Sequence, residues 1–578
     1  MQKTAAWLAR HALEQLGVTH TFGIPGVHNT ELYDELGASD KITPVLVAHE
    51  GGGAFMADAI SRTGASIGTL LIVPAAGVTH AASGIGEAFL DGIAMLIIAG
   101  GVRRDLGRAY QLHDMDQHAL LKPITKGTWR VERHADVVPV IYEAWRIATS
   151  GEPGPVFVEI PVELQLIPGE AGDIPAFVAP AAGASRASAA DIERAAALLR
   201  HASRPGIFCG WGAVDASDQL EQLAERLGAP VATTLQGLST FRGNHPLHAG
   251  FALGPSAVPA SHNAFRDCDC LLAAGTRFAE IATGSYGCEV PANLIHVDIN
   301  PQVFGANYAA AVALEGDARA VLTELLDRLG PVADGEARRA RVAAKIAEDK
   351  AAYLDAWLSH DPRGRVNPAR FFGALRQRLP DDAIVVADDG NHTFLTAELL
   401  PLHAPRTFFS PSDFNSMGYC VPGVIGAKLA RPGRTVIGIV GDGAIRMTGL
   451  EMATAVAQGL GVVWFVFNDG ELGQIAQAQA APYNRKTCTV LPALDFEGLA
   501  RANHVGYELM ENDAAVDGAI GRALTAAAAG RPVLVDVRID YSKRTRFTEG
   551  TLRTNIMRFD FAMRTRLVGR ALWRRITE

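Results

Sequence analysis

The feature that most limits what this chain can fold into is a repeating order of short apolar strands and alanine-rich stretches. The strands are rich in Val and Ile and stop at Gly or Asp, and a helix-like stretch follows each of them. Strand–helix–strand units of this kind build parallel sheets with helices on both faces. The expected strands are 68–73, 94–101 and 155–161, then 205–213, 269–278 and 294–301, then 383–394, 435–443, 462–470 and 533–540. The sequence therefore predicts an α/β fold of three doubly wound parallel-sheet domains.

Three domains also suit the length, because 578 residues exceed one core and domains usually hold about 150–200 residues. A stretch rich in Pro, Ala and Gly at 168–191 predicts a surface linker, and a charged helical segment at 336–357 leads into the third block. We expect domains at 1–168, 190–332 and 365–542, followed by a basic helical tail at 543–578.

Composition excludes several classes of protein. A net charge of −9 argues against a general nucleic-acid binder, which needs a basic surface. No apolar run approaches the roughly 20 residues that span a bilayer, and the start of the chain reads as an amphipathic helix rather than a signal peptide. Six scattered cysteines do not form a disulfide framework. We therefore expect a cytoplasmic protein.

Two turns at neighbouring strand ends carry the strongest chemical signal. One expected strand ends at Gly441-Asp442-Gly443, and the next ends at Asn468, followed by Gly470. The carboxyl ends of parallel strands share one edge of a sheet, where ligands bind. A carboxylate, an amide oxygen and the backbone carbonyl near Gly470 suit Mg²⁺, and the helix that opens at Gly443 and Ala444 offers N–H groups to a diphosphate. The stretch predicts a diphosphate site bridged by a metal.

The same stretch resembles the thiamine-diphosphate-dependent enzymes, in the branch of acetolactate synthase, pyruvate oxidase and the 2-oxo acid decarboxylases. The resemblance rests on the Gly-Asp-Gly turn and an Asn-Asp pair that follows 24 residues (444–467) later. It implies pyrimidine-binding, middle and diphosphate-binding domains, in that order, with thiamine diphosphate and Mg²⁺ as cofactors.

The other half of the cofactor site is expected in LVAHEGGGAFMADAISRTG (46–64). The resemblance implies that Glu50 hydrogen-bonds the aminopyrimidine of the cofactor and promotes loss of the thiazolium C2 proton. It further assigns cofactor contacts in ADDGNHTF (387–394) and SMGYCVPGVIGAKLA (416–430), where Met417 supports the bent cofactor. The cofactor-binding candidates are Glu50, Asn391, His392, Asn415, Met417, Gly441, Asp442, Gly443, Ala444, Asn468 and Leu472, and the metal candidates are Asp442, Asn468 and Gly470.

The substrate pocket is less clearly marked. FGIPGVHNTELYDEL (22–36) and AAGVTHAASGIGEAFLDGIAML (75–96) resemble family segments, with His80 where Asn is usual. His28, Gln111 and His113 are candidates for catalysis beside Glu50. His28, His80, Asn484 and Arg485 are candidates for substrate contacts.

The resemblance implies decarboxylation of a pyruvate-like 2-oxo acid and carboligation of the enamine to an acceptor. GDGAIRMTGLEMATAV (441–456) looks like acetolactate synthase, but Gly473–Gln477 lacks the Trp of those synthases. Three alternatives remain open: a decarboxylase of a larger, for example guanidino, 2-oxo acid; a flavin-linked oxidase; and a catalytically silent relative. FAD is a possible ligand, since AAGTRFAEIATGSYG (273–287) partly resembles a flavin-binding segment, and a middle domain that holds nothing is the other reading.

The expected partners are the 2-oxo acid, its acceptor and further copies of the chain. The family pairs the Glu50 half of one subunit with the Asp442 half of another, which predicts a homodimer or homotetramer. The tail 543–578 holds ten basic and three acidic residues, with apolar residues at every fourth position from Phe559. Such a helix can lie on an anionic membrane, but we expect it to pack on its own body or cover the mouth of the site.

Overall fold

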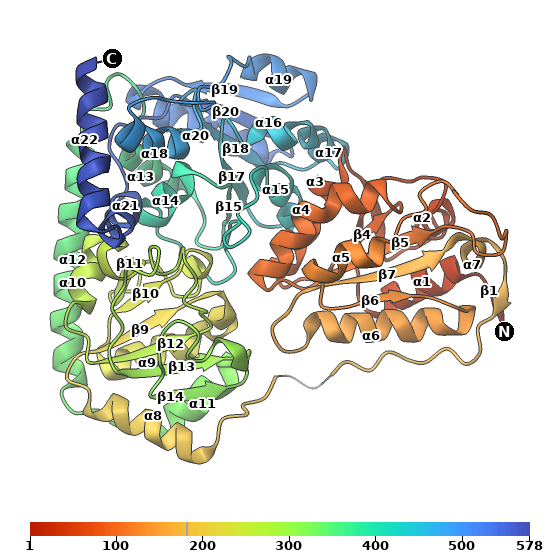
Figure 1. Cartoon of the computed structure of the whole chain (residues 1–578), viewed down its shortest axis with the longest axis horizontal. Coiled ribbons are helices and arrows are strands. Elements are labelled where there is room, and N and C mark those ends of the chain that lie inside the picture. The colour runs from red at the N-terminus through yellow and green to blue at the C-terminus, as the bar shows by residue number, and fades with distance from the viewer. Residues whose placement is uncertain (181–182, 578) are drawn as a thin grey trace.

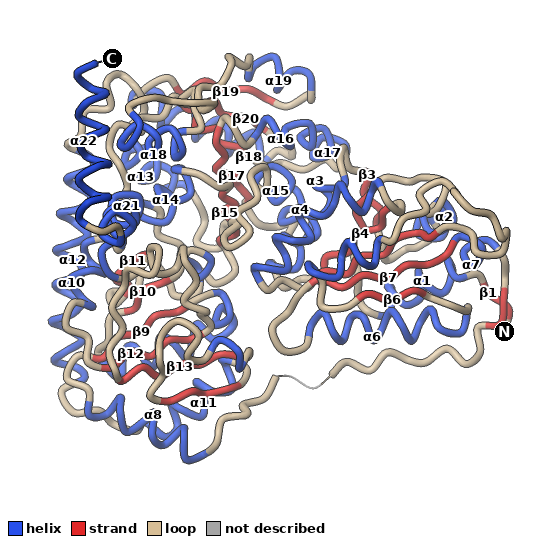
Figure 2. The backbone as a smooth tube through the Cα atoms, viewed as in Figure 1, coloured by secondary structure: helices blue, strands red, loops and turns tan. Residues whose placement is uncertain are grey.

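The computed structural model describes residues 1–180 and 183–577, without the side chains of 481, 482, 567, 568, 571, 572 and 574–577. Three six-stranded parallel sheets, each flanked by helices, account for most of the chain (Figures 1 and 2). The predicted fold class is therefore confirmed. Within the described residues, no helix is both long enough and apolar enough to cross a membrane.

The first sheet has the strand order β3-β2-β4-β5-β7-β6. Its strands are β2 (His20–Gly23), β3 (Thr43–Leu46), β4 (Gly68–Ile72), β5 (Met95–Gly101), β6 (Thr128–Arg130) and β7 (Pro155–Pro161). Its helices are α1 (Ala5–Gln15), α2 (Thr30–Gly37), α3 (Glu50–Arg62), α4 (Ala76–Asp91), α5 (Gln117–Leu121), α6 (Val137–Thr149) and α7 (Val162–Leu166). Every residue of β5 and β7 is buried, as expected for central strands covered on both faces. The two short strands β1 (Gln2–Lys3) and β8 (Gly169–Glu170) pair antiparallel beside this sheet.

The second sheet has the order β11-β10-β9-β12-β13-β14. Its strands are β9 (Pro205–Cys209), β10 (Val231–Thr233), β11 (His248–Phe251), β12 (Cys270–Ala274), β13 (Asn293–Asp298) and β14 (Val312–Glu315). Its helices are α8 (Ala189–His201), α9 (Ser217–Leu227), α10 (Pro259–Phe265) and α11 (Ala318–Leu329). The long helix α12 (Gly335–Leu358) contacts α9 and α10 and leads into the third block.

The third sheet has the order β16-β15-β17-β18-β20-β19. Its strands are β15 (Ile384–Ala387), β16 (Phe408–Phe409), β17 (Val436–Gly441), β18 (Val463–Phe467), β19 (Gly506–Met510) and β20 (Val533–Val537). Its helices are α13 (Pro368–Arg378), α14 (Asn391–Leu399), α15 (Cys420–Ala430), α16 (Ile445–Thr448), α17 (Met452–Ala457), α18 (Gly473–Tyr483), α19 (Phe496–Ala502) and α20 (Val516–Ala528). The tail forms α21 (Arg546–Arg558) and α22 (Phe561–Thr577), so the predicted helical tail is confirmed.

Helix α3 of the first block packs against α15 of the third, where their colours meet in Figure 1. The two backbones approach so closely that a methyl group at Gly426 would lie 2.2 Å from the carbonyl oxygen of Met56. Met56, Val421 and Ile425 belong to one buried cluster that spans both sheets. This shared core fixes the start of α3, and with it Glu50, relative to the third sheet.

Candidate functional site

The carboxyl edge of the third sheet brings Asp442 and Asn468 together. Asp442 follows β17, and one of its carboxylate oxygens accepts a hydrogen bond of 2.8 Å from the Gly470 N–H, just beyond β18. Asn468 donates its amide to Asp536 at 2.9 Å, which leaves its side-chain oxygen for a ligand. The Gly470 carbonyl already accepts from the Leu491 N–H at 2.9 Å and keeps a second lone pair.

Two carboxyl groups crowd this edge. Burial raises the pKa of Asp442 to about 6, and burial together with the Asp442 charge raises that of Asp469 to about 7. A bound divalent cation would compensate the charge of both groups. The donor set of carboxylates and an amide oxygen fits Mg²⁺.

Two buried donors next to this edge lack partners among the described residues: Asn391 Nδ2 and His392 Nε2. Both belong to the first turn of α14, directly after Gly390, whose φ of 146° favours glycine. Burial lowers the pKa of His392 to about 3, so the imidazole is neutral, and Nε2 donates in the tautomer that places the single ring proton on it. Unpaired buried donors of this kind fit the oxygens of a diphosphate.

Glycines keep the space beside these donors open. A methyl group at Gly441 would lie 3.0 Å from His392, and one at Gly443 would lie 2.5 Å from Leu472. Ala444 precedes α16, which has only four residues, and a 3₁₀ turn follows it. The helix expected to open at Gly443 and Ala444 therefore begins as a short piece.

The segment that carries Asn415 and Met417 is held by a residue that sequence reasoning missed. Asp388 is fully buried, and its carboxylate accepts hydrogen bonds of 2.8 Å from the N–H groups of Gly418 and Cys420. Burial raises the pKa of Asp388 to about 7. Met417 is half-buried and lies beside Gly443, whereas Asn415 is exposed with a φ of 66°. The sequence feature that could have identified Asp388 is its place immediately after the buried strand β15.

Glu50 begins α3 and is buried, with 5% of its surface exposed. Its carboxylate lies 3.0 Å from His80 Nδ1 in the first turns of α4. His49 caps α3 by accepting the Gly51 N–H at 3.0 Å, and its ring stacks on that of His80 with 4.7 Å between centroids. The structure thus places His80 against the predicted relay carboxylate.

Glu451 is a second residue that sequence reasoning missed. Its carboxylate reaches from the third block and accepts hydrogen bonds of 2.9–3.1 Å from the N–H groups of Ala48 and His49. It therefore ties the diphosphate-binding half of the chain to the backbone that precedes Glu50. Its signal was the acidic residue in the Thr-Gly-Leu-Glu run, 448–451.

The structure brings the side chains of His28 and His113 together, but it does not bring Gln111 to them. The Nδ1 atoms of the two imidazoles are 3.3 Å apart, and burial together with His113 lowers the pKa of His28. Gln111 instead donates to the carbonyl of Arg103 at 2.7 Å, within its own loop. Asn484 caps α18, and Arg485 lines an open hollow of about 290 Å³ at the end of that helix.

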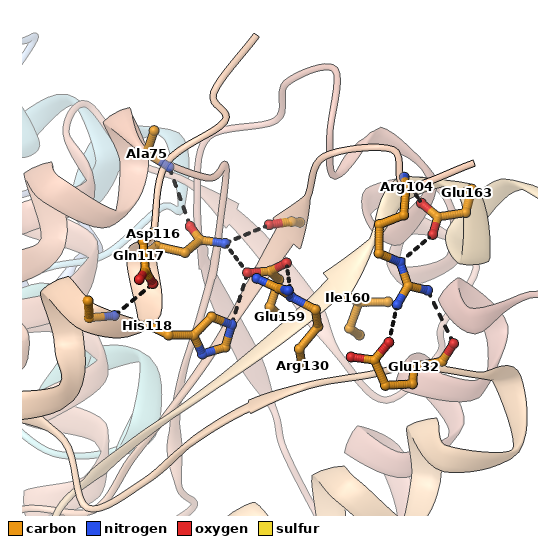
Figure 3. Close-up of polar contacts among 12 residues, drawn as sticks. Ala75, Arg104, Asp116, Gln117, His118, Arg130, Glu132, Glu159, Ile160 and Glu163 are labelled. Atoms are coloured by element: carbon orange, nitrogen blue, oxygen red, sulfur yellow. Dashed lines mark hydrogen bonds and ion pairs between the residues drawn. The ribbon is translucent and has the colours of Figure 1, made fainter. Parts of the chain in front are cut away.

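A buried network beside α4 was also missed. Gln117 accepts the Ala75 N–H at 3.4 Å and donates to Glu159 at 2.7 Å (Figure 3). His118 at 3.0 Å and Arg130 at 2.9 Å complete the contacts of the Glu159 carboxylate. Gln117 is the first residue of α5 and follows closely after Gln111 and His113, the candidates that the sequence suggested in this stretch.

A cavity of about 340 Å³ lies where the three sheets' domains meet. The cavity is lined by Gly275 and Asp298, at strand ends of the second sheet, and by Arg277. Arg277 pairs with Glu152 of the first block at 3.0 Å and with Asp413 of the third at 2.5 Å. The volume is within the range of small-ligand pockets.

Comparison with known proteins gives three matches to family models, one for each sheet. The thiamine pyrophosphate enzyme N-terminal TPP binding domain matches residues 2–120, the central domain 192–325 and the C-terminal TPP binding domain 388–537.

Individual relatives are similar over most of the chain. The acetolactate synthase large subunit of Corynebacterium glutamicum is 31% identical over 495 residues, covering 83% of this chain and 77% of that protein. The acetolactate synthase isozyme 3 large subunit of Escherichia coli is 29% identical over 562 residues, covering 94% and 96%. A probable 2-ketoarginine decarboxylase of Pseudomonas aeruginosa is 35% identical over 483 residues, covering 82% and 83%.

Proposed function

Because the chain belongs to the thiamine pyrophosphate enzyme family, we propose that it decarboxylates a 2-oxo acid and joins the remaining unit to an acceptor, as acetolactate synthases do. The cofactor, thiamine diphosphate, supplies the carbanion chemistry when bound. The chain's own contribution is to hold the cofactor, place one carboxylate and exclude water.

The observation that supports this function best is the set of unpaired donors and crowded carboxylates at the edge of the third sheet. Asn391 and His392 would donate to diphosphate oxygens, and Asp442 and Asn468 would hold Mg²⁺. Met417 and Leu472 would pack against the cofactor beside Gly443. Residues 1–168, 190–332 and 365–542 would form the three domains.

Glu50 would hold the proton that moves to and from the aminopyrimidine. We place this carboxylate against the diphosphate half of a partner subunit, which makes the working enzyme at least a homodimer. Exposed Leu46 and Leu450 flank the contact of Ala48 with Glu451, and large apolar side chains exposed together are typical of an interface. We also propose a cytoplasmic location.

Simple decarboxylation of a guanidino 2-oxo acid is the second candidate. It is favoured by the 35% identity to the probable 2-ketoarginine decarboxylase, and by the absence of Trp in Gly473–Gln477. His28 and His113 would then face a longer substrate.

The cavity at Arg277 is the proposed site of FAD, if the enzyme carries a flavin. Its strand-end glycines and Asp298 would contact the nucleotide part. Absorbance of the purified protein near 450 nm tests this directly.

One experiment separates the candidates. Purified protein with thiamine diphosphate and Mg²⁺ is assayed against pyruvate, 2-oxobutyrate and 2-ketoarginine, and products are identified by mass spectrometry. A carboligation product from pyruvate supports the first function, and an aldehyde from 2-ketoarginine supports the second. No turnover of any 2-oxo acid by the wild type, with bound cofactor verified, would reject both; Glu50→Gln serves as the inactive control.

A further inference from the structure

The turn that starts α4 has a strained backbone. Ala75, the residue before the helix, has φ 53° and ψ −85°, a conformation that costs a non-glycine residue free energy. Such strain persists only where surrounding contacts hold the backbone in place. The structure therefore contains something that keeps this turn from relaxing.

Gln117 provides that restraint. It is buried, with 2% of its surface exposed, and its side-chain oxygen accepts the Ala75 N–H. Its amide donates to Glu159, whose two carboxylate oxygens are occupied by His118 and Arg130 (Figure 3). Gln117 is thus anchored to β7, the strand that lies between β5 and β6 in the first sheet.

The helix that begins at this turn delivers two contacts to Glu50. His80 Nδ1 lies 3.0 Å from one carboxylate oxygen, and Gly77 approaches the other so closely that a methyl group there would lie 3.3 Å from it. The His80 ring also stacks on His49, the residue that caps α3. The surroundings of both Glu50 carboxylate oxygens therefore depend on where α4 starts.

We propose that His80 is a positioning residue for Glu50, and that Gln117, anchored on Glu159, holds the strained turn that brings His80 into place. A hydrogen bond to a carboxylate limits its rotation, and a relay carboxylate must hold one orientation toward the group it protonates. The inference rests on the proposed role of Glu50.

The test measures exchange of the cofactor C2 proton with deuterated water, which requires no substrate. In His80→Ala we expect the exchange rate to fall about tenfold, with the affinity for thiamine diphosphate, measured by calorimetry, within about twofold of wild type. His80→Asn keeps a donor at the position of Nδ1 and is expected to retain the rate within about threefold. His403→Ala, which removes a histidine–carboxylate pair with Asp381 at 2.7 Å elsewhere, is the matched control and should match wild type.

Gln117→Leu tests the second half of the proposal. We expect it to slow exchange by a similar factor, and the double variant with His80→Ala to be no slower than either single variant, because both act through one contact. In crystals of the cofactor-free variants, the Glu50 carboxyl should lose its single orientation.

Wild-type exchange in His80→Ala would overturn the proposal, as would multiplicative losses in the double variant. Failure of every 2-oxo acid as a substrate would reject the proposed function and leave this result intact, since exchange reports the cofactor alone.

Discussion

At the scale of single residues, the site is defined by polar groups whose burial is unfavourable unless a ligand is bound. Asp442 and Asp469 lie together under burial that disfavours ionisation, and Asn391 and His392 bury donors without partners among the described residues. Leaving buried polar groups unpaired costs about 1–3 kcal/mol each. A diphosphate with its metal would satisfy all four groups, so cofactor binding should stabilise the fold.

Asp442→Ala is expected to weaken the binding of thiamine diphosphate in Mg²⁺ by at least about tenfold, because the metal loses its carboxylate ligand. Calorimetry with saturating Mg²⁺ measures the change. Asp382→Ala, at an exposed position of the same block, is the control and should bind as wild type does. Equal affinity of the two variants would contradict the assignment.

Ala75→Gly is expected to stabilise the protein by about 1 kcal/mol, because glycine adopts a positive φ without strain. Urea unfolding followed by far-UV circular dichroism measures the shift. Ala76→Gly, one residue later and exposed within the first turn of α4, should destabilise the protein instead. A loss of stability in Ala75→Gly would show that the turn is not strained.

At the scale of elements, α4 connects Glu50 to the segment 412–416 of the third block. One face carries His80 and Ser83 and continues to Glu87 and Asp91, and the segment 412–416 lies along it. Glu87 accepts the N–H groups of Ser412 at 3.3 Å and Ser416 at 2.9 Å. Movement of this helix would therefore shift Glu50 and the segment 412–416 together.

Glu87 also predicts a pH dependence of stability. Burial, with the neighbouring Asp91, raises the pKa of Glu87 to about 10, against 4.5 for the free side chain. The folded chain keeps this proton as the pH rises above about 4.5, while the unfolded chain releases it, so rising pH favours unfolding up to about pH 10. Glu87→Gln, which cannot titrate, should therefore gain stability relative to wild type by roughly 1 kcal/mol per pH unit between pH 6 and 8. If the urea unfolding midpoints of wild type and Glu87→Gln changed by the same amount between pH 6 and 8, the prediction would be wrong.

Sequence patterns predicted some of the strands and missed others, for physical reasons that can be identified. Inner strands such as β5 and β18 are continuous apolar runs, and strand-end polar residues such as Asp442 and Asn468 stand out against them. Edge strands were missed because they are short: β16 has two residues and β6 has three. Pair contacts such as Glu50–His80 join positions 30 residues apart, and no local pattern encodes them.

At the scale of the whole molecule, the tail joins two domains. Helix α21 packs on the second block, where Arg558 donates to the carbonyl of Ser285, and its Phe547 is buried and stacks on Phe394 at 4.2 Å. Helix α22 lies along α18, with the Arg570 guanidinium 4.9 Å from the Tyr483 ring centroid (Figure 1). The two helices therefore have different roles: α21 is part of the core, and α22 contacts α18, the helix that follows the loop with Asn468 and Gly470.

This division determines where the tail should be cut. Removal of everything after Tyr541 would also remove Phe547 from the core, whereas a stop after Asp560 removes α22 alone. We expect the shorter truncation to fold with an unfolding temperature within about 2 °C of wild type, because the side chains at 561–566 of α22 are exposed or half-buried. Since α18 begins directly after the loop with Asn468, Gly470 and Leu472, loss of its contact with α22 should raise the KM for the 2-oxo acid at least about threefold. Co-sedimentation with anionic phosphatidylserine vesicles should be the same with and without α22. Full activity of the truncated enzyme, together with vesicle binding that only the full chain shows, would assign α22 to a membrane surface instead of the site.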